Sequence, residues 1–315
     1  MQTGKPSRAR DKGEDAKPRR YMVAGQAVDA PRLAPGLYLV ATPIGNLRDI
    51  TLRALEILAA ADLVACEDTR ISRKLFDHYG LSTPLIAYHD HNADAARPKI
   101  LEMLTAGGAL ALISDAGTPL ISDPGYKLVR AAAEAGHPVT AAPGPSAALT
   151  AVTVAGLPTD RFFFEGFLPA KEAARRTRIA ALARIPATLV LFESGPRLAA
   201  TLADLAAGLG TREAAIAREL TKLHEEVRRG DLAALAADYA AGAETRGEIV
   251  IVIAPPAAEQ PSAADIDALL RAALARTSVK EAVAEVAAAT GESRRAVYSR
   301  ALTLTKDQYG TPDRT

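Results

Sequence analysis

Five short segments combine carboxylates, imidazoles, glycines and prolines directly after apolar runs. They are PIGN (43–46), EDTR (67–70), HDHN (89–92), DAGTP (115–119) and PGPS (143–146). Carboxylates and imidazoles can take up protons, and glycine lets a backbone approach a ligand closely. We interpret the five segments as loops of one candidate site.

The DAGTP loop follows ALALIS, an uninterrupted apolar run that is typical of a strand buried on both faces. Gly117 tolerates a positive φ and Pro119 cannot donate a hydrogen bond, so the strand must end there. The next turn predicts a helix that begins near Pro124, with Ser122 or Asp123 as its cap. A strand, a Gly-rich loop and a helix build ligand sites in α/β sheets, although a tight structural connection needs the same residues.

Apolar runs alternate with helical patterns over the first half of the chain, which predicts a mostly parallel, doubly wound sheet. Right-handed crossovers then bring the carboxyl ends of all strands to one edge, so the five loops should converge. The expected strands are 37–42, 63–66, 85–88, 109–114 and 139–142, and the expected helices begin near Thr51 and cover 94–106 and 125–135.

A linker at 157–160 precedes a second α/β unit. Its expected strands are 162–165, 188–193, 214–218, 224–230 and 248–254, with helices over 171–184, 196–207 and 231–241. Beyond Pro261, a Gly291 stop followed by a Ser293 cap predicts two short helices joined by a turn. We therefore expect a disordered basic tail (1–35), two α/β domains (36–157 and 158–256) and a helical extension (257–315).

The composition limits the function classes. The 315 residues are 49% hydrophobic and 24% charged with a formal net charge of +1, as in an ordinary globular protein. This balance excludes a general basic field, so any RNA contact must use a local patch. The single cysteine, Cys66, excludes a disulfide framework and suits a reducing compartment. No signal peptide or membrane span is recognisable, so we expect a cytoplasmic protein.

Several common motifs are missing from the sequence. It contains neither GxGxxG nor GxxxxGK[ST], and neither GxSxG nor HExxH. His89, Asp90 and His91 could bind a metal, but no further ligand has a clear spacing, so we expect none. Pro/Gly loops at a sheet edge favour a neutral or zwitterionic ligand held by backbone groups.

The chain resembles the tetrapyrrole-methylase superfamily of S-adenosylmethionine (SAM) enzymes. Within it, the chain is most similar to the branch that methylates a cytidine ribose 2′-oxygen at the decoding centre of 16S ribosomal RNA. The similarity covers about residues 37–305 and rests on LYLVATPIGNLRDITLRALEIL, ACEDTR, HDHN, LISDAGTPLISDPGYKLVR, PGPSAALTA, GLPTDRFFFEGFLP, ARELTKLHEE, RGEIVIVI and SVKEAVAEVAAATG. Tetrapyrrole C-methylases carry a Gly-Gly-Asp-Pro-like loop in place of Ala-Gly-Thr-Pro. The departures are Arg246, where lysine is usual, and a longer N-terminal tail.

The resemblance implies two α/β domains, the second with a mixed sheet, and SAM in the cleft between them. Small residues would let backbone groups approach the cofactor. The cofactor-binding residues carried over by position are Pro43, Asp115, Ala116, Gly117, Thr118, Ile121, Ser146, Ala147, Phe192, Glu193, Ile216 and Glu248.

The implied reaction is displacement at the sulfonium methyl by a ribose 2′-oxygen, which alignment accelerates and a base assists. Asp68, His89 and Asp90 are the candidate bases. Arg70 and Lys222 could hold the RNA phosphate or the developing alkoxide. The acids of EDTR have a structural alternative, because carboxylates are also favoured at a helix start.

The implied partners are the 16S ribosomal RNA of the small subunit and a second protomer, with no membrane. Arginines on helices can equally form a solvated face, so these RNA contacts are one of two interpretations. The candidate contacts are Arg48, Arg70, Arg73, Lys74, the helix over 171–178, Arg294 and Arg295.

Two other functions compete with RNA methylation. A tetrapyrrole C-methylase is disfavoured by the DAGTP loop and the helical extension. A non-catalytic RNA-binding assembly factor is disfavoured by EDTR and HDHN, because a pure RNA binder has no need of carboxylates in a phosphate-facing cleft.

Overall fold

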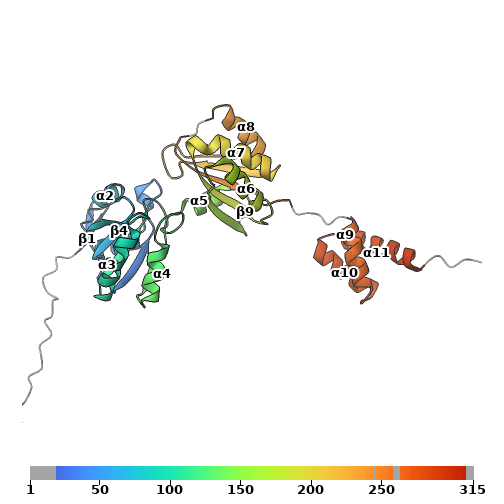
Figure 1. Cartoon of the computed structure of the whole chain (residues 1–315), viewed down its shortest axis with the longest axis horizontal. Helices are drawn as coiled ribbons and strands as arrows, with labels where there is room; N and C mark the ends of the chain where they lie inside the picture. Colours follow the sequence, from blue (N-terminus) through green and yellow to red (C-terminus); the bar gives the residue numbers. More distant parts are fainter. Residues whose placement is uncertain (1–18, 244–245, 258–262, 310–315) are drawn as a thin grey trace, which may run out of the picture. The chain divides into compact units, whose positions relative to one another are not determined.

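The computed structural model describes residues 19–243, 246–257 and 263–309. The chain divides into two compact units, Met1–Pro256 and Ala257–Thr315. The larger unit contains two α/β domains (Figure 1). No helix in the described part of the chain is long and apolar enough to cross a membrane.

The first domain has a five-stranded sheet in the order β5-β4-β6-β3-β7, with every pair parallel. This confirms the expected doubly wound sheet. Its elements are β3 (Gly36–Val40), the 3-10 turn η1 (Leu47–Asp49), α1 (Leu52–Ala60), β4 (Leu63–Cys66), α2 (Thr69–His78), β5 (Leu85–Ala87), α3 (Ala93–Thr105), β6 (Ala109–Ile113), α4 (Tyr126–Glu134) and β7 (Val139–Ala142).

Helices cover both faces of this sheet. Leu55 of α1 and Phe76 of α2 pack on one face, and Ile100 of α3 and Leu128 of α4 pack on the other. The central strand β6 is buried along its whole length, with successive residues in the two cores. An uninterrupted apolar sequence therefore forms this strand, because neither face meets water.

A β-hairpin of β1 (Arg20–Val23) and β2 (Gln26–Asp29) occupies part of the segment that we expected to be disordered. That expectation is wrong for this part, whereas 1–18 lie outside the described residues. Tyr21 is only 3% exposed and joins the core of α1 and α2. Arg19 hydrogen-bonds the last carbonyls of α1 and pairs with Asp62 at 2.8 Å. The segment has few apolar residues, so its composition did not indicate that one tyrosine is buried.

The second domain has a mixed sheet in the order β11-β10-β12-β9-β8, as expected. Only β8 and β9 are parallel, and the other neighbours are antiparallel. Its elements are α5 (Ala147–Ala155), β8 (Phe162–Phe167), α6 (Glu172–Leu182), β9 (Thr188–Ser194), α7 (Gly195–Leu209), β10 (Glu213–Arg218), β11 (Glu226–Asp231), α8 (Leu232–Ala240) and β12 (Glu248–Ile253).

The two faces of this sheet pack differently. Helices α6, α7 and α8 cover one face. Helix α5 covers the other, together with Ile44 from the first loop of the first domain. We placed α5 with the first domain on sequence grounds, but its alanines and Val152 are buried against the second sheet. The PGPS loop therefore leads directly from one domain into the other.

The smaller unit consists of α9 (Ala263–Leu274), α10 (Val279–Thr290) and α11 (Arg294–Tyr309), packed around Leu270, Val286 and Val297. Helix α10 starts with a capping box of Ser278 and Glu281 and ends at Gly291 with φ +73°. The predicted helix signals at Gly291 and Ser293 are thus confirmed, since Ser293 accepts from the Ala296 amide at 3.2 Å.

We predict that Tyr21→Ala lowers the free energy of unfolding by about 3 kcal/mol, because it leaves a cavity between the hairpin and α1. Tyr126→Ala is the matched control, since Tyr126 is 66% exposed on α4; it should cost less than about 0.5 kcal/mol. Urea unfolding followed by circular dichroism measures both. Equal stability of the two variants would show that the packing of Tyr21 on α1 does not contribute to the stability of the domain.

Candidate cofactor and acceptor site

The polar loops meet at the carboxyl edge of the first sheet and are joined by direct hydrogen bonds. Thr42 and Gly117 exchange backbone hydrogen bonds of 2.9 and 3.0 Å. Thr118 donates its hydroxyl to the Pro145 carbonyl at 3.1 Å, and Asp115 Oδ1 accepts from the Asp68 amide at 3.0 Å. These bonds confirm the predicted convergence for four loops, and HDHN lines a hollow together with EDTR and Asp115.

Gly117 is required by this packing. It has φ +83°, and a Cβ atom there would lie 3.3 Å from Cγ2 of Ile44. A side chain would therefore be both strained and crowded. The loop can approach PIGN closely only with glycine at this position.

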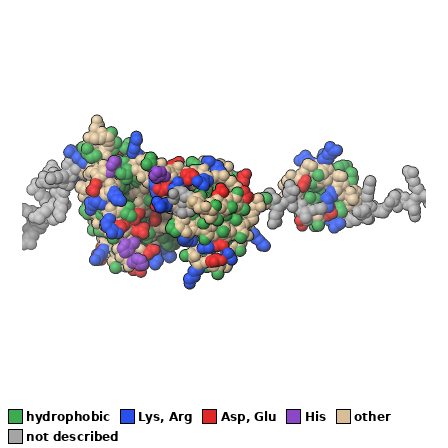
Figure 2. Space-filling view, turned by 90° about the horizontal axis from the view of Figure 1, so that it is seen from above, with side chains coloured by type: hydrophobic (Ala, Val, Ile, Leu, Met, Phe, Trp, Pro, Cys, Tyr) green, Lys and Arg blue, Asp and Glu red, His purple; other side chains and the backbone are tan. Residues whose placement is uncertain are grey.

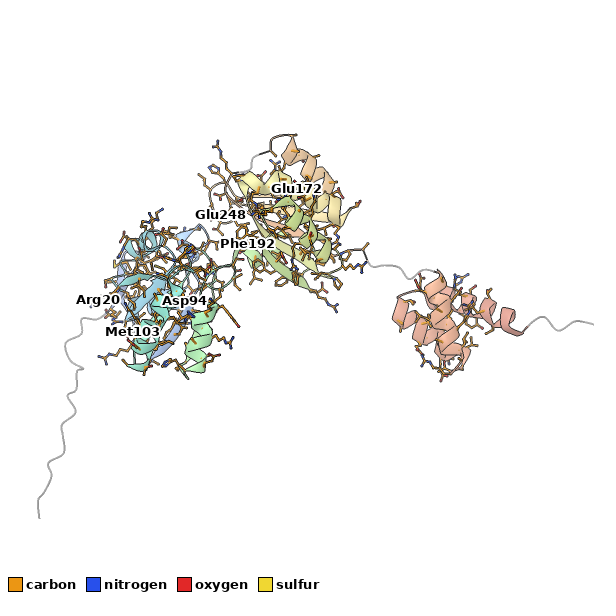
Figure 3. All side chains as sticks on the ribbon, viewed as in Figure 1. Arg20, Asp94, Met103, Glu172, Phe192 and Glu248 are labelled. Carbon is orange, nitrogen blue, oxygen red and sulfur yellow. The ribbon has the colours of Figure 1, made fainter. Side chains whose placement is uncertain are left out.

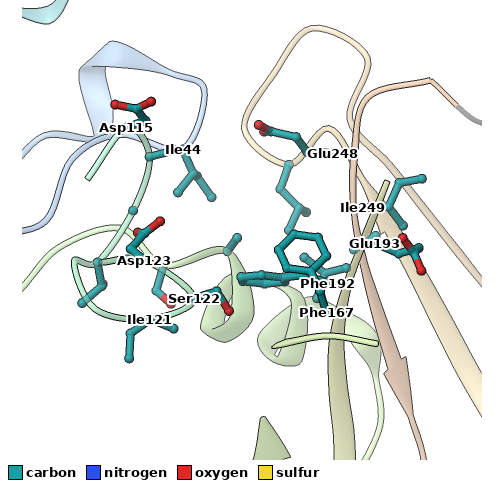
Figure 4. A pocket seen from close by; sticks show the side chains of 18 residues that line it. Ile44, Asp115, Ile121, Ser122, Asp123, Phe167, Phe192, Glu193, Glu248 and Ile249 are labelled. Atoms are coloured by element: carbon teal, nitrogen blue, oxygen red, sulfur yellow. The ribbon is translucent and has the colours of Figure 1, made fainter. Parts of the chain in front are cut away.

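A cavity of about 280 Å³ lies between these loops and the second sheet (Figure 4). Phe192 and Glu248 come from β9 and β12 of the second domain (Figure 3). The lining residues are Ile44, Asp115, Ala116, Gly117, Thr118, Ile121, Ser122, Asp123, Ser146, Ala147, Phe167, Phe192, Glu193, Ala217, Leu220, Glu248, Ile249 and Val250.

The electrostatics of this cavity suit a ligand that carries positive charge. Its charged lining residues are Asp115, Asp123, Glu193 and Glu248, and no lysine, arginine or histidine is among the residues that line it. The N-terminus of α5 also opens here at Ser146, whose side chain makes no capping hydrogen bond. A helix N-terminus attracts a carboxylate. The cavity thus offers complementary sites for both charges of a zwitterion.

Most of the cofactor residues expected from sequence line this cavity. Those brought together are Asp115, Ala116, Gly117, Thr118, Ile121, Ser146, Ala147, Phe192, Glu193 and Glu248. Pro43 lines a neighbouring hollow instead. Ile216 is fully buried in the core beneath α7 and α8, and its neighbour Ala217 faces the cavity. Strand alternation explains this difference, since adjacent residues point to opposite faces.

Several lining residues were missed by sequence reasoning. Ile249 and Val250 belong to a strand whose apolar pattern is uniform, so it gives no indication of a cavity. Phe167 follows a bulge in β8, and its ring lies 5.7 Å from that of Phe192. Asp123 was interpreted as a helix cap. The other missed residues are Ile44, Ser122, Ala217 and Leu220.

A second hollow, of about 460 Å³, lies beside the first. Asp115 lines both, so the two hollows meet at its side chain. The predicted residues Asp68, Arg70 and His89 are thereby brought together. The full lining is Glu67, Asp68, Thr69, Arg70, Ala87, His89, His91 and Asp115. Figure 2 shows that acidic and basic side chains are interspersed on this face of the larger unit.

Asp68 has a structural function. It is the N-cap of α2, and its carboxylate accepts from the Arg70 amide at 2.8 Å. The same carboxylate pairs with the Arg70 guanidinium at 2.6 Å. This pairing and the capping bond lower the pKa of Asp68 to about 2. Asp68 is therefore a weak base, and the helix-start interpretation accounts for its position.

His89 and Asp90 are less constrained. The Nδ1 atom of His89 is buried and has no hydrogen-bond partner among the described residues. Asp90 is exposed, and its charge helps to raise the pKa of Glu67, after the larger effect of burial. Both residues stay candidates for contact with a substrate. Among the described residues, no three or more histidine, cysteine, aspartate or glutamate side chains cluster so that they could hold a metal ion.

Lys222 does not line the second hollow. Its Nζ donates to Glu219 at 2.8 Å and to Glu248 at 2.7 Å, and its stem packs over Gly45. Burial lowers the pKa of Lys222, but the two carboxylates outweigh burial and raise it. Thr221 beside it accepts from the Asn46 amide at 3.2 Å. These contacts favour a positioning function between the PIGN loop and the cavity rim.

The basic helix α6 is held by internal ion pairs. Arg175 is 7% exposed and bonds Asp204 at 2.7 Å, and Arg176 bonds the same carboxylate at 2.8 Å. Arg178 forms two bonds of 2.6 Å with Glu165. The arginines of this helix, which we expected to contact RNA, are therefore better explained as partners in ion pairs within the domain. Arg48, Arg73 and Lys74 remain exposed near the carboxyl edge.

Comparison with solved structures identifies the class of the fold. The uroporphyrin-III C-methyltransferase of Thermus thermophilus has a TM-score of 0.51 and 21% identity over 70% of this chain and 94% of that one. Diphthine synthase has a TM-score of 0.53 and 16% identity, over 69% and 89%. The family model for tetrapyrrole (corrin/porphyrin) methylases matches residues 36–236. The protein is thus a methyltransferase with the tetrapyrrole-methylase fold.

Sequence relatives narrow this class. The ribosomal RNA small subunit methyltransferase I of Mesorhizobium japonicum is 54% identical over 93% of this chain and 99% of its own. The protein of that name from Escherichia coli O157:H7 is 46% identical over 84% and 94%. The model for the RsmI C-terminal HTH domain matches residues 260–305. The chain belongs to the ribosomal RNA small subunit methyltransferase I family.

The cofactor of this family is SAM, and the cavity suits it. SAM carries a sulfonium, an ammonium and a carboxylate, and supplies an electrophilic methyl group. The acidic lining matches its cations, and the α5 N-terminus matches its carboxylate. Phe192 provides an aromatic wall, and small residues at 116–117 and 146–147 leave room for the backbone to contact the ligand.

We predict that Lys222→Met weakens SAM binding about fivefold, corresponding to about 1 kcal/mol for a partly exposed ion pair. Lys222→Arg should restore binding, since it keeps both carboxylate contacts. Isothermal titration calorimetry measures the affinity, and kcat should change less than about twofold at saturating SAM. A large fall in kcat at unchanged affinity would instead support alkoxide stabilisation by Lys222.

Proposed function

We propose that the protein methylates the ribose 2′-oxygen of a decoding-centre cytidine in 16S ribosomal RNA, with SAM as the donor. The observation that carries this proposal is the position of Asp115. It lines both the acidic cofactor cavity and the hollow formed by EDTR and HDHN. A methyl group held in the first cavity would therefore face a nucleotide held in the second.

The second hollow offers the groups that a nucleotide needs. The side chain of Arg70 is 88% exposed, so its guanidinium can reach a phosphate while it remains paired with Asp68. His89 supplies a buried nitrogen without a partner among the described residues. We infer that these residues orient the acceptor ribose, and that orientation provides most of the rate enhancement.

The alternative functions find less support. The relatives with high identity are named as ribosomal RNA methyltransferases, whereas the tetrapyrrole enzyme compared above shares only 21% identity. An assembly factor without catalysis does not fit a methyltransferase family. We also infer that the protein works in the cytoplasm, where small subunits are found, and that a second protomer extends its RNA-binding surface.

The test is methyl transfer from radiolabelled SAM to small subunits from cells that lack the gene. Nuclease digestion and nucleoside analysis then locate the label. We expect 2′-O-methylcytidine at one decoding-centre site. Label on a base, in protein or in a porphyrinoid would contradict the proposal and leave the fold and the cofactor cavity intact.

The smaller unit contributes a second candidate RNA surface. Arg294 and Arg295 are exposed on α11, and no ion pair to either occurs in the described part of the chain. Arg300 instead bonds Asp267 of α9 at 3.1 Å, so it ties two helices together. Of the three arginines, we therefore assign the RNA contact to the first two.

We predict that the double variant Arg294→Ala, Arg295→Ala binds small subunits with a smaller slope of log K against log salt concentration. The slope should decrease by about one unit per side chain, without a change in Tm. Arg300→Ala is the control, which should lower Tm and leave the salt slope of the folded protein unchanged. Filter binding at several salt concentrations measures the slope. An unchanged slope in the double variant would remove α11 from the RNA surface.

A further inference from the structure

Asp123 does not perform the structural task that its sequence position predicts. Helix α4 begins at Tyr126, its N-cap is Gly125, and no side chain caps it. Neither Ser122 nor Asp123 is the cap, so that prediction is wrong. A carboxylate at this helix start would be favourable. Instead, the Asp123 side chain lies in the cofactor cavity (Figure 4).

The backbone around Asp123 is held in an unusual conformation. Leu120 and Ser122 have φ values of 72° and 63°, which non-glycine residues rarely adopt. Gly125 has φ +131°, and a Cβ there would lie 2.8 Å from Leu112. Ser122 packs closely on Gly166 of β8 in the second domain. Backbone strain of this kind persists where the surroundings fix it, and it clusters at functional sites.

The surroundings of Asp123 contain acids and a hydroxyl. Burial chiefly raises its pKa, to about 6; the charges of Glu67 and Asp115 add to this and the Ser114 hydroxyl opposes it. Across the cavity lie Glu193 and Glu248. None of the residues that line the cavity is a lysine, arginine or histidine, so no cation there compensates the charge of Asp123.

We propose that Asp123 accepts the proton of the acceptor hydroxyl during methyl transfer. This rests on the proposed function and adds the base that it lacks. The ribose oxygen forms its bond to the methyl carbon as the carbon–sulfur bond breaks, with that electron pair going to sulfur. The hydroxyl proton moves to a carboxylate oxygen of Asp123. Asp123 lines the cofactor cavity together with Asp115, the residue at which the cavity and the acceptor hollow meet. It also lies close enough to Glu67 of the acceptor hollow for the two charges to interact.

Three other carboxylates, Asp68, Asp115 and Glu193, are less suited to this step. Asp68 is occupied by its capping bond and by Arg70, and its pKa of about 2 makes it a poor proton acceptor. Asp115 is held by the Asp68 amide. Glu193 is buried, and its oxygens accept from the Ser194 amide at 2.8 Å and the Thr201 hydroxyl at 2.7 Å. A base works best with a pKa close to the working pH, which Asp123 approaches.

The test is Asp123→Asn, which keeps the size of the side chain and removes its charge. Single-turnover methylation of small subunits should slow by about 10² to 10⁴-fold. SAM affinity, measured by calorimetry, should fall far less than the rate, because Asp115, Glu193 and Glu248 remain to match the positive charges of the cofactor. The wild-type rate should fall as pH drops through about 6, because protonated Asp123 cannot accept a proton. The residual activity of the variant should lack this fall in rate at low pH, which we call the acid limb.

Thermal stability gives an independent readout. A folded-state pKa above that of the unfolded chain means that the ionised group destabilises the fold above that pKa. The Tm of Asp123→Asn at pH 8 should therefore equal or exceed that of the wild type. Asp160→Asn is the matched control, because Asp160 is exposed and outside both hollows; it should change neither rate nor Tm.

Three outcomes would overturn the inference. In the first, the variant keeps more than about a tenth of the wild-type rate. In the second, it loses SAM affinity by as much as it loses rate, which would show that Asp123 acts by binding the cofactor. In the third, Glu67→Gln abolishes the acid limb while Asp123→Asn keeps it. If the wild-type protein labels no RNA, the proposed function fails; if wild type and variant label RNA equally, only the assignment of Asp123 fails.

Discussion

The two backbone hydrogen bonds between Thr42 and Gly117 are the constraint on which the site depends. They fix the end of β3 against the end of β6, and this places Ile44 so that its side chain enters the core of the second domain. The cofactor cavity is the space left between this joint and β12. Because the joint uses backbone groups, it needs glycine at position 117 and tolerates little change nearby.

Desolvation distinguishes the carboxylates that follow the strands. Asp68 lies at the start of α2, where amide hydrogens and Arg70 stabilise its charge. Asp123 lies in a cavity lined by further acids, where nothing comparable stabilises it. The same residue type therefore has a structural function in one loop and a chemical one in the next. The difference comes from the partners that each loop brings within reach.

Arginines are divided in a similar way. On α6 they neutralise Asp204 and Glu165, which are almost completely buried, so their charge is used inside the domain. On α2 and α11 several basic side chains point to solvent and are available to a phosphate backbone. A chain with a net charge of +1 can thus bind RNA only through a few exposed patches.

The sequence by itself determined the strands, the crossovers and the convergence of the five loops, since these follow from apolar periodicity and the handedness of connections. The resemblance to the tetrapyrrole-methylase superfamily, and not the strand pattern, indicated ten of the residues that line the cavity. The tertiary structure decided what depends on long-range partners. It packed Tyr21 into the core and buried Arg175 of α6 against Asp204. It also turned Ile216 away from the cavity and made Gly125, instead of Asp123, the N-cap of α4. A local pattern cannot predict such choices, because competing local structures differ by about 1 kcal/mol and one distant contact outweighs that difference.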